Sequence, residues 1–274
     1  MIKVAFQGEP GAYSELVLYQ FFKENTQSLP CSSFRAIFES IYSDTADYGV
    51  LPVENSLEGT VIPAYDELVY SKLTIQRELI LPVKHCLLAC QGVALRDIET
   101  VISHPQALGQ CSNHIKALGI KPEPFLDTAG AAKHIQEINS KTIAAIASKL
   151  ASEYYQLNVL KENFEDEHFN YTRFFVLGKE NTTRDDNIEY KTSIIFSGQN
   201  KPKLLSMVLN AIAQYEIDLT KIESRPTRNK AWDYMFFLDF KGHCEDENIK
   251  QALESVSQIT DYLNILGSYQ TEHY

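Results

Sequence analysis

Short apolar runs alternate with helical patterns through the larger part of the chain. The run at residues 4–6 precedes a helical pattern that we expect Ser14 to cap, and an apolar helical stripe over residues 34–41 follows a predicted cap at Ser33. Further strand-then-helix pairs lie at residues 100–119, at 124–138 with a predicted cap at Asp127, and at 142–157 with a predicted cap at Ser148. Because such alternation lays successive strands side by side, it predicts an α/β fold with a mostly parallel sheet in each of two lobes.

The order of the patterns changes after a polar stretch at residues 179–189, which we expect to be a linker. The strands predicted there are residues 191–196, 219–224, 234–240 and 263–267, with helices from about Leu204 to Ile212 and from about Asp246 to Val256. The resulting order, βαββαβ, predicts a ferredoxin-like unit. Its small size and exposed sheet favour pairing with a second copy, so we expect a homo-oligomer.

The composition excludes several classes of function. The 274 residues are 44% hydrophobic and 22% charged, with a net charge of −11, and show no basic face for nucleic acid. Five cysteines without a CxxC pair and seven histidines without an HxH or HxxxH pattern indicate neither disulfides nor a metal site. Since no leader and no apolar run of membrane-spanning length is found, we expect a cytoplasmic protein without a membrane partner.

Polar side chains gather where two predicted strands end. They are Glu54, Asn55 and Ser56 after the strand at residues 47–53, and Ser103, His104 and Gln106 after the strand at residues 100–103. Open α/β sheets bind ligands at the carboxyl ends of their strands. A histidine such as His104 is, taken alone, more often structural, but the two clusters together predict one cleft between the lobes.

The stretch at residues 170–174, Asn-Tyr-Thr-Arg-Phe, begins another predicted strand. A strand would hold the Thr172 hydroxyl and the Arg173 guanidinium rigidly, and this pair suits an anionic substrate. The alternative is an ordinary strand in which Thr172 serves β-propensity and Arg173 lies on the surface.

A glycine-rich turn at residues 7–15 follows the first strand. Backbone N–H groups in such a turn can bind an anion, although an ordinary strand-to-helix connection has the same sequence character. The turn matches neither GxGxxG nor a Walker sequence, so a nucleotide site is not supported.

Four segments in order resemble the motifs of prephenate dehydratases. They are residues 8–15, 49–56, 103–106 and 172–174. Residues 223–226, Glu-Ser-Arg-Pro, resemble the signature of the ACT domain that follows the catalytic domain in this family. The resemblance implies a catalytic domain at residues 1–182, with a first lobe at about 1–80 plus 163–182 and a second at about 81–162, similar to type-2 periplasmic binding proteins. An ACT regulatory domain would occupy residues 190–274.

The implied reaction converts prephenate to phenylpyruvate, CO2 and water in L-phenylalanine biosynthesis, without cofactor or metal. By the same matching, Thr172 would assist the departing hydroxyl, either by hydrogen bonding or by proton transfer. The other implied site residues are Asn55, Ser56, Ser103 and Gln106, which orient substrate; Glu54, a second acid or an anchor; Arg173, the cation; and Phe174, which packs the ring. Backbone N–H groups near Ser14, Ser56 and Gln106 would bind much of the anionic charge, and His104 belongs to the same substrate-binding set.

Two other functions share these motifs or this architecture. Arogenate dehydratase acts on a substrate that differs only by an amino group, and a non-catalytic amino-acid sensor could combine a binding-protein-like domain with an ACT domain. The intact Thr172-Arg173-Phe174 sequence argues against the sensor.

The predicted effector site departs from the family pattern. The resemblance implies that L-phenylalanine binds between paired ACT domains at Leu204, Glu223, Ser224, Arg225 and Pro226. Where inhibited relatives have a Gly-Ala-Leu type of run, this chain has Pro202 and Lys203 before Leu204, which removes a backbone N–H and adds bulk and charge. We therefore expect phenylalanine to bind weakly, if at all.

Overall fold

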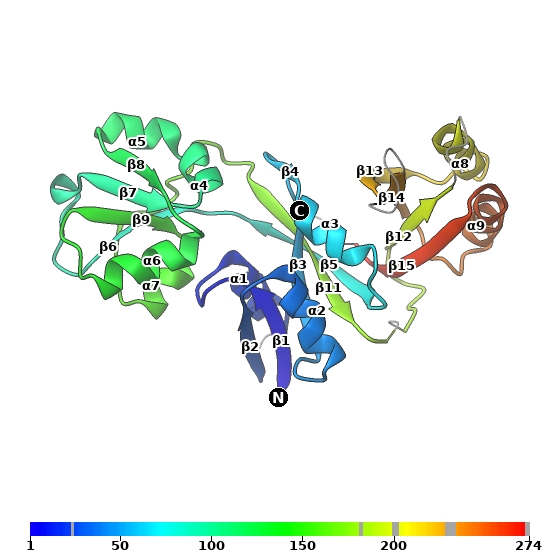
Figure 1. Ribbon diagram of the computed structural model, residues 1–274, viewed down its shortest axis with the longest axis horizontal. Helices are drawn as coiled ribbons and strands as arrows, with labels where there is room; N and C mark the ends of the chain where they lie inside the picture. The colour runs from blue at the N-terminus through cyan, green and yellow to red at the C-terminus, as the bar shows by residue number, and fades with distance from the viewer. Residues whose placement is uncertain (23–24, 181–182, 199–202, 228–233, 272–274) are drawn as a thin grey trace. The chain divides into compact units, whose positions relative to one another are not determined.

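The computed structural model describes residues 1–22, 25–180, 183–198, 203–227 and 234–271 (Figure 1). The chain forms two compact units. The first unit is Met1–Ala64 with Leu79–Phe174, and the second unit is Tyr65–Glu78 with Phe175–Tyr274. Helix α3 and strands β5 and β11 therefore divide between the units.

The first unit begins with a sheet in the order β2-β1-β3-β11-β5. Strand β1 pairs in parallel with both β2 and β3, and β4 adds a short antiparallel hairpin to β3. The elements of this sheet and its connections are β1 (Ile2–Gln7), α1 (Tyr13–Phe22), β2 (Thr26–Cys31), α2 (Phe34–Tyr42), β3 (Tyr48–Asn55), β4 (Gly59–Thr60), α3 (Ile62–Leu68), β5 (Thr74–Pro82) and β11 (Tyr171–Gly178); parts of α3, β5 and β11 belong to the second unit. Strand β2 was not predicted, because its polar sequence with Pro30 suits only the edge position that it occupies.

The second sheet of the first unit has five strands in the order β10-β6-β9-β7-β8. Its elements are β6 (Cys86–Ala89), η1 (Leu95–Asp97), β7 (Thr100–Ser103), α4 (Pro105–Gln110), α5 (Ser112–Leu118), β8 (Lys121–Pro124), α6 (Thr128–Glu137), β9 (Ile143–Ala147), α7 (Lys149–Tyr154) and β10 (Asn158–Lys161). Pairs β9-β7 and β7-β8 are parallel, whereas β6 runs antiparallel to both β9 and β10. The sheet is mixed because only a short 3₁₀ turn, and no crossover helix, connects β6 to β7.

Three of the four predicted helix caps are confirmed. The Ser33 and Ser148 hydroxyls accept from the N–H groups of Ala36 and Ala151 at 3.2 and 3.0 Å, and an Asp127 oxygen accepts from Gly130 at 2.6 Å. The prediction for Ser14 is wrong.

Helix α1 begins at Tyr13, so Ser14 lies inside its first turn and is buried. The Glu15 carboxylate, not the Ser14 hydroxyl, accepts the N–H of Gly11, at 2.7 Å.

Within the described residues no helix is long and apolar enough to cross a membrane.

The second unit contains the predicted βαββαβ order. Its strands pair antiparallel in the order β13-β14-β12-β15. The elements are β12 (Tyr190–Ser197), α8 (Leu204–Ala213), β13 (Leu219–Pro226), β14 (Tyr234–Lys241), α9 (Glu247–Ile259) and β15 (Tyr262–Gln270). Both helices pack on one face of this sheet, over a core that includes Ile194, Phe196, Leu238 and Phe240.

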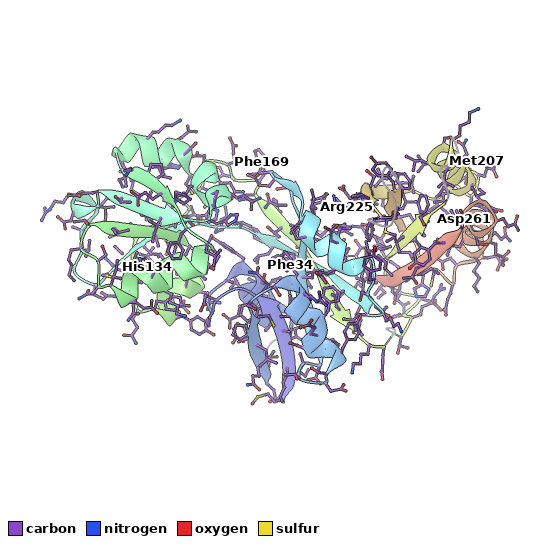
Figure 2. The ribbon with its side chains drawn as sticks, in the orientation of Figure 1. Phe34, His134, Phe169, Met207, Arg225 and Asp261 are labelled. Carbon is purple, nitrogen blue, oxygen red and sulfur yellow. The ribbon has the colours of Figure 1, made fainter. Side chains whose placement is uncertain are left out.

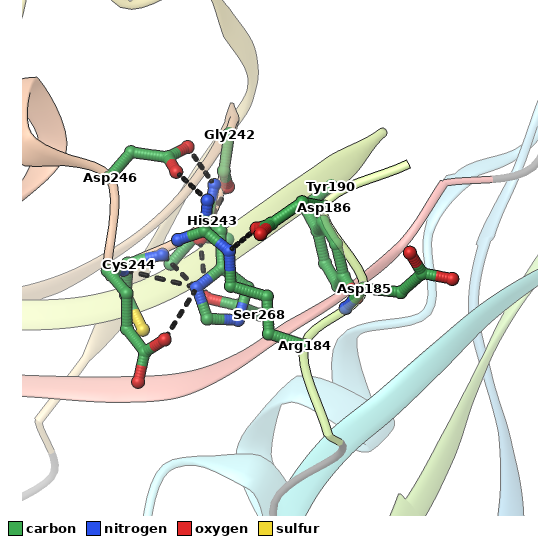
Figure 3. A network of polar contacts seen from close by, with 11 residues as sticks. Arg184, Asp185, Asp186, Tyr190, Gly242, His243, Cys244, Asp246 and Ser268 are labelled. Atoms are coloured by element: carbon green, nitrogen blue, oxygen red, sulfur yellow. Dashed lines mark hydrogen bonds and ion pairs between the residues drawn. The ribbon is translucent and has the colours of Figure 1, made fainter. Parts of the chain in front are cut away.

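The predicted linker at residues 179–189 has no helix or strand among its described residues, but ion pairs hold it in place at Arg184. Figure 3 shows Arg184 between two carboxylates, 2.6 Å from an Asp186 oxygen and 2.8 Å from an Asp246 oxygen. Asp246 also accepts the backbone N–H of His243 at 2.8 Å, and the His243 ring meets Tyr190 edge-on at 4.8 Å between centroids. The ion pairs thus fix this part of the linker to the second unit.

Candidate active site

Asn55, at the end of β3, is the centre of a polar network in the first unit. Its Oδ1 accepts the backbone N–H groups of Leu57 and Glu58 at 3.0 and 3.1 Å. Its Nδ2 lies 3.0 Å from the Thr172 Oγ1, 2.7 Å from the Asn170 Oδ1 and 3.1 Å from the Tyr171 carbonyl oxygen, so three acceptors share its two protons. The two backbone donors identify the oxygen end of the amide, so the other end donates to Thr172.

Thr172 lies near the start of β11, beside β3. Since its Oγ1 accepts from Asn55, the hydroxyl proton is directed elsewhere. Within the described part of the chain no acceptor takes that proton, so Thr172 can donate to a bound molecule.

The network extends through Asn170 to Gln110, a residue that is not among those predicted from the sequence. Asn170 is 1% exposed, and its Nδ2 donates to Gln110 Oε1 at 2.9 Å. Gln110 is the last residue of α4, four positions after the predicted Gln106. The side chain of Gln106 is exposed, and its backbone N–H donates to Nδ1 of the capping His104 at 3.3 Å. The one-turn spacing of the two glutamines was the available signal, since it places them on one helix face.

Glu54 and Arg173 form a second contact between β3 and β11. Nη1 of Arg173 lies 3.6 Å from a Glu54 oxygen, and the Arg173 side chain is 12% exposed. Consecutive side chains leave a strand on opposite faces. Arg173 therefore projects from the face opposite Thr172, and its guanidinium is partly neutralised.

Several predicted site residues hold strands and turns together. The Ser56 hydroxyl donates to the Phe169 carbonyl at 2.8 Å, and the buried Ser103 hydroxyl donates to the Ile146 carbonyl at 2.6 Å. Phe174 is 1% exposed and belongs to the core. Phe169 is itself exposed, beside these strand ends (Figure 2).

The backbone N–H groups near Ser56 are occupied. Ser56 donates its own to the Tyr171 carbonyl at 2.8 Å, and the next two residues donate to Asn55. The predicted anion binding by these groups is therefore not available in this conformation.

The glycine-rich turn connects two parts of the first unit and is not an open anion site. Gly11 has φ +90°, and a Cβ there would lie 2.6 Å from the Cα of Ala151. The N–H of Gly8 donates to Cys31 at 3.0 Å, and the Ser148 hydroxyl donates to the Gly11 carbonyl at 2.5 Å. The glycine is needed because the backbone of α7 approaches so closely.

The predicted effector residues lie in the second unit. Leu204 begins α8 and is buried, and Glu223, Ser224, Arg225 and Pro226 form the end of β13. The Nε of Arg225, labelled in Figure 2, is 2.9 Å from an Asp66 oxygen. Lys203 is exposed in a left-handed conformation with φ 76°, and Pro202 lies outside the described residues.

The first unit is a two-lobed α/β unit with polar side chains at its strand ends, and a βαββαβ unit follows it. Together they define the class of protein: an α/β enzyme with an ACT-type domain. The prephenate dehydratase family model matches residues 4–182, and the ACT domain model matches residues 192–258. The chain therefore belongs to the prephenate dehydratase family, a family of hydro-lyases, as its motifs predicted.

Named relatives agree with this assignment. The chain is 40% identical to arogenate dehydratase/prephenate dehydratase 2 of Arabidopsis thaliana, over 99% of this chain and 73% of the relative. It is 28% identical to the Arthrobacter aurescens prephenate dehydratase solved in complex with L-Phe, with TM-score 0.90, covering 98% of this chain and 90% of the other. It is 33% identical to GqqA, described as a novel type of quorum quenching acylase, with TM-score 0.92 and 98% of both chains covered.

Proposed function

We propose that this protein converts prephenate to phenylpyruvate, CO2 and water, as a step of L-phenylalanine biosynthesis. The observation that carries the proposal is the hydrogen bond from Asn55 Nδ2 to Thr172 Oγ1, within a chain that belongs to this family. It leaves the threonine proton available to the substrate hydroxyl.

The reaction is a 1,4-elimination. The bond from the ring to its carboxylate breaks and releases CO2, the electron pair completes the aromatic ring, and the ring hydroxyl leaves from the opposite carbon. Thr172 donates its hydroxyl proton to that departing oxygen, which leaves as water, and Asn55 stabilises the negative charge that develops on the threonine oxygen until solvent returns the proton. A neutral donor set suits this step, because a cation on the ring carboxylate would stabilise the group that has to be lost.

The test is formation of phenylpyruvate, followed by its absorbance, with prephenate and arogenate offered separately. We expect turnover of prephenate. Phenylalanine formed from arogenate, without turnover of prephenate, would make the protein an arogenate dehydratase, and turnover of neither would favour a sensor.

The similarity to GqqA supports a second candidate activity, cleavage of an acyl group. The same preparation should be offered an acylated quorum-sensing signal. Release of the acyl group that survives Thr172→Ala would show an activity separate from the elimination.

For the second unit we propose an ACT domain that pairs with another copy in a homodimer or homotetramer. L-Phenylalanine is the candidate effector, because the Arthrobacter aurescens relative was solved with L-Phe. Lys203 is exposed at the start of α8. Its charge lies where L-phenylalanine would have to come close to the backbone in order to bind. Calorimetric titration with L-phenylalanine, together with activity at the same concentrations, should show weak binding; tight binding with strong inhibition would contradict this.

A further inference from the structure

The polar network does not end at Gln110. Gln110 Oε1 is 2.9 Å from His85 Nε2, and His85 Nδ1 is 2.7 Å from the Tyr13 hydroxyl oxygen. We call the resulting series of side chains the amide relay; in order it consists of Tyr13, His85, Gln110, Asn170, Asn55 and Thr172.

The direction of every bond in the relay follows from Asn55. Its oxygen is occupied by two backbone N–H groups, so it offers an N–H to the oxygen of Asn170. Asn170 must then turn its own amide nitrogen to Gln110, whose oxygen faces both Asn170 and His85. An amide oxygen can only accept, so Nε2 of His85 carries a proton.

His85 has surroundings that keep it neutral. His85 is 2% exposed, and this burial lowers the pKa of its ring, while burial holds the pKa of Tyr13 well above its usual value. A nearby carboxylate, that of Glu165, accepts the His85 backbone N–H at 2.8 Å and pairs with Lys84 at 3.2 Å. Nδ1 of the neutral ring is therefore an acceptor for the Tyr13 hydroxyl, at 2.7 Å, and the Lys84 carbonyl is a second acceptor for the same hydroxyl, at 3.0 Å.

We propose that His85 is a positioning residue for the elimination: as the Nε2–H form, it keeps the amides of Gln110 and Asn170 turned so that an oxygen faces the Asn55 amide nitrogen. Two backbone N–H groups fix the orientation of the Asn55 amide itself, and the acceptor on Asn170 keeps its nitrogen in place beside Thr172. Without that donor, Gln110 is free to turn its nitrogen toward Asn170. Asn170 would then turn its own nitrogen toward Asn55, where two donors would meet, and Thr172 would lose its orientation. This inference rests on the proposed function.

Two substitutions separate the two ring nitrogens. Gln at position 85 places an amide nitrogen near the Nε2 position and can donate to Gln110, whereas Asn reaches only the Nδ1 position, beside Tyr13. We expect His85→Asn to lower kcat at least about tenfold with KM within about twofold, and His85→Gln to keep more than about a third of kcat. Equal losses in both variants would overturn the proposal.

A matched control is His134→Asn. His134 lies on α6 (Figure 2). It stacks on Phe125 at 5.2 Å between ring centroids and is not a member of the relay. It should have the kcat and KM of the parent, and thermal midpoints of all variants show whether a loss reflects unfolding.

A double-mutant cycle with Thr172→Ala tests whether His85→Asn lowers kcat through the Thr172 hydroxyl. Once the hydroxyl is gone the relay has nothing to orient, so His85→Asn should then cost less than about twofold. A histidine that merely supports the fold would cost the same factor in both backgrounds, which would overturn the proposal.

Nitrogen-15 NMR of the histidine ring tests the same proposal without any activity. We expect the Nε2–H form of His85 in the parent, and an Nδ1–H form would overturn the relay. A parent that makes no phenylpyruvate but shows the Nε2–H form would refute the proposed function while leaving the orientation of the relay supported.

Discussion

The two units hold their polar interiors together in different ways. In the first unit the side chains beside Thr172 are neutral amides and an imidazole, each held by directional hydrogen bonds. In the second unit two contacts are ionic, although Ser193 there hydrogen-bonds to Asp239 and Tyr269. Glu78, with no exposed surface, pairs with Lys191 at 2.8 Å, and Asp66 pairs with Arg225 at 2.9 Å. Amides set direction without adding charge, which suits a site that must not over-stabilise a departing carboxylate. Charges add strength, and their loss should affect stability more than catalysis.

The largest effect should come from breaking the ionic contact. Lys191→Met removes the Lys191 ammonium from the buried carboxylate of Glu78, and we expect a loss of about 3 kcal/mol in the free energy of unfolding. Denaturant unfolding measures it. The control is Lys121→Met, which removes an exposed pair with Glu123 and should leave the midpoint unchanged. A Lys191→Met protein as stable as its parent would show that the comparison is mistaken.

Thr172→Ala should affect catalysis and leave stability nearly unchanged, the opposite of Lys191→Met. We expect kcat to fall at least about tenfold with little change in KM, since the hydroxyl acts mainly on the departing group in the transition state. Thr172→Ser should keep more activity, and the thermal midpoint should hardly move. Steady-state kinetics with prephenate check this, and equal activity of the Ala variant and the parent would remove Thr172 from the mechanism.

Arg173→Lys combines features of the two preceding substitutions, because Arg173 is a charged residue but belongs to the first unit. We expect a marked fall in kcat/KM, smaller than that of Thr172→Ala, because a point charge does not replace a planar fork. If Arg173 acts by holding Glu54, then Glu54→Gln should cost a similar factor. An unchanged kcat/KM for Arg173→Lys would make Arg173 dispensable to substrate.

The smallest effect is a pH dependence shared by both units. Burial is the main cause that lowers the pKa of His85 and of His243 below 6.5, although Glu165 and Glu245 oppose it. The unfolded state then binds more protons than the folded state, so stability falls as pH drops through 6.5 toward the folded pKa values. Unfolding at several pH values should show a shallower fall in His85→Gln and in His243→Gln, and a fall as steep as that of the parent would contradict the assignment.

Much of the fold followed from short patterns. Ser33, Asp127 and Ser148 cap their helices as expected, and the βαββαβ order appears as predicted. Ser14 failed as a cap because a glutamate one residue later could reach the turn, a competition that residue preferences alone do not resolve.

The sequence by itself determined the family, the order of elements and the presence of Asn55 and Thr172 in motifs at strand ends. Only the tertiary structure decided which side chains meet. Asn55 bonds to a threonine 117 positions later, and Tyr13 meets His85 across 72 positions, so neither contact has a local signature. Caps and apolar periodicity depend on neighbours within a turn or two, whereas the amide relay depends on strand register and on how α1 and α4 pack, which the whole fold sets.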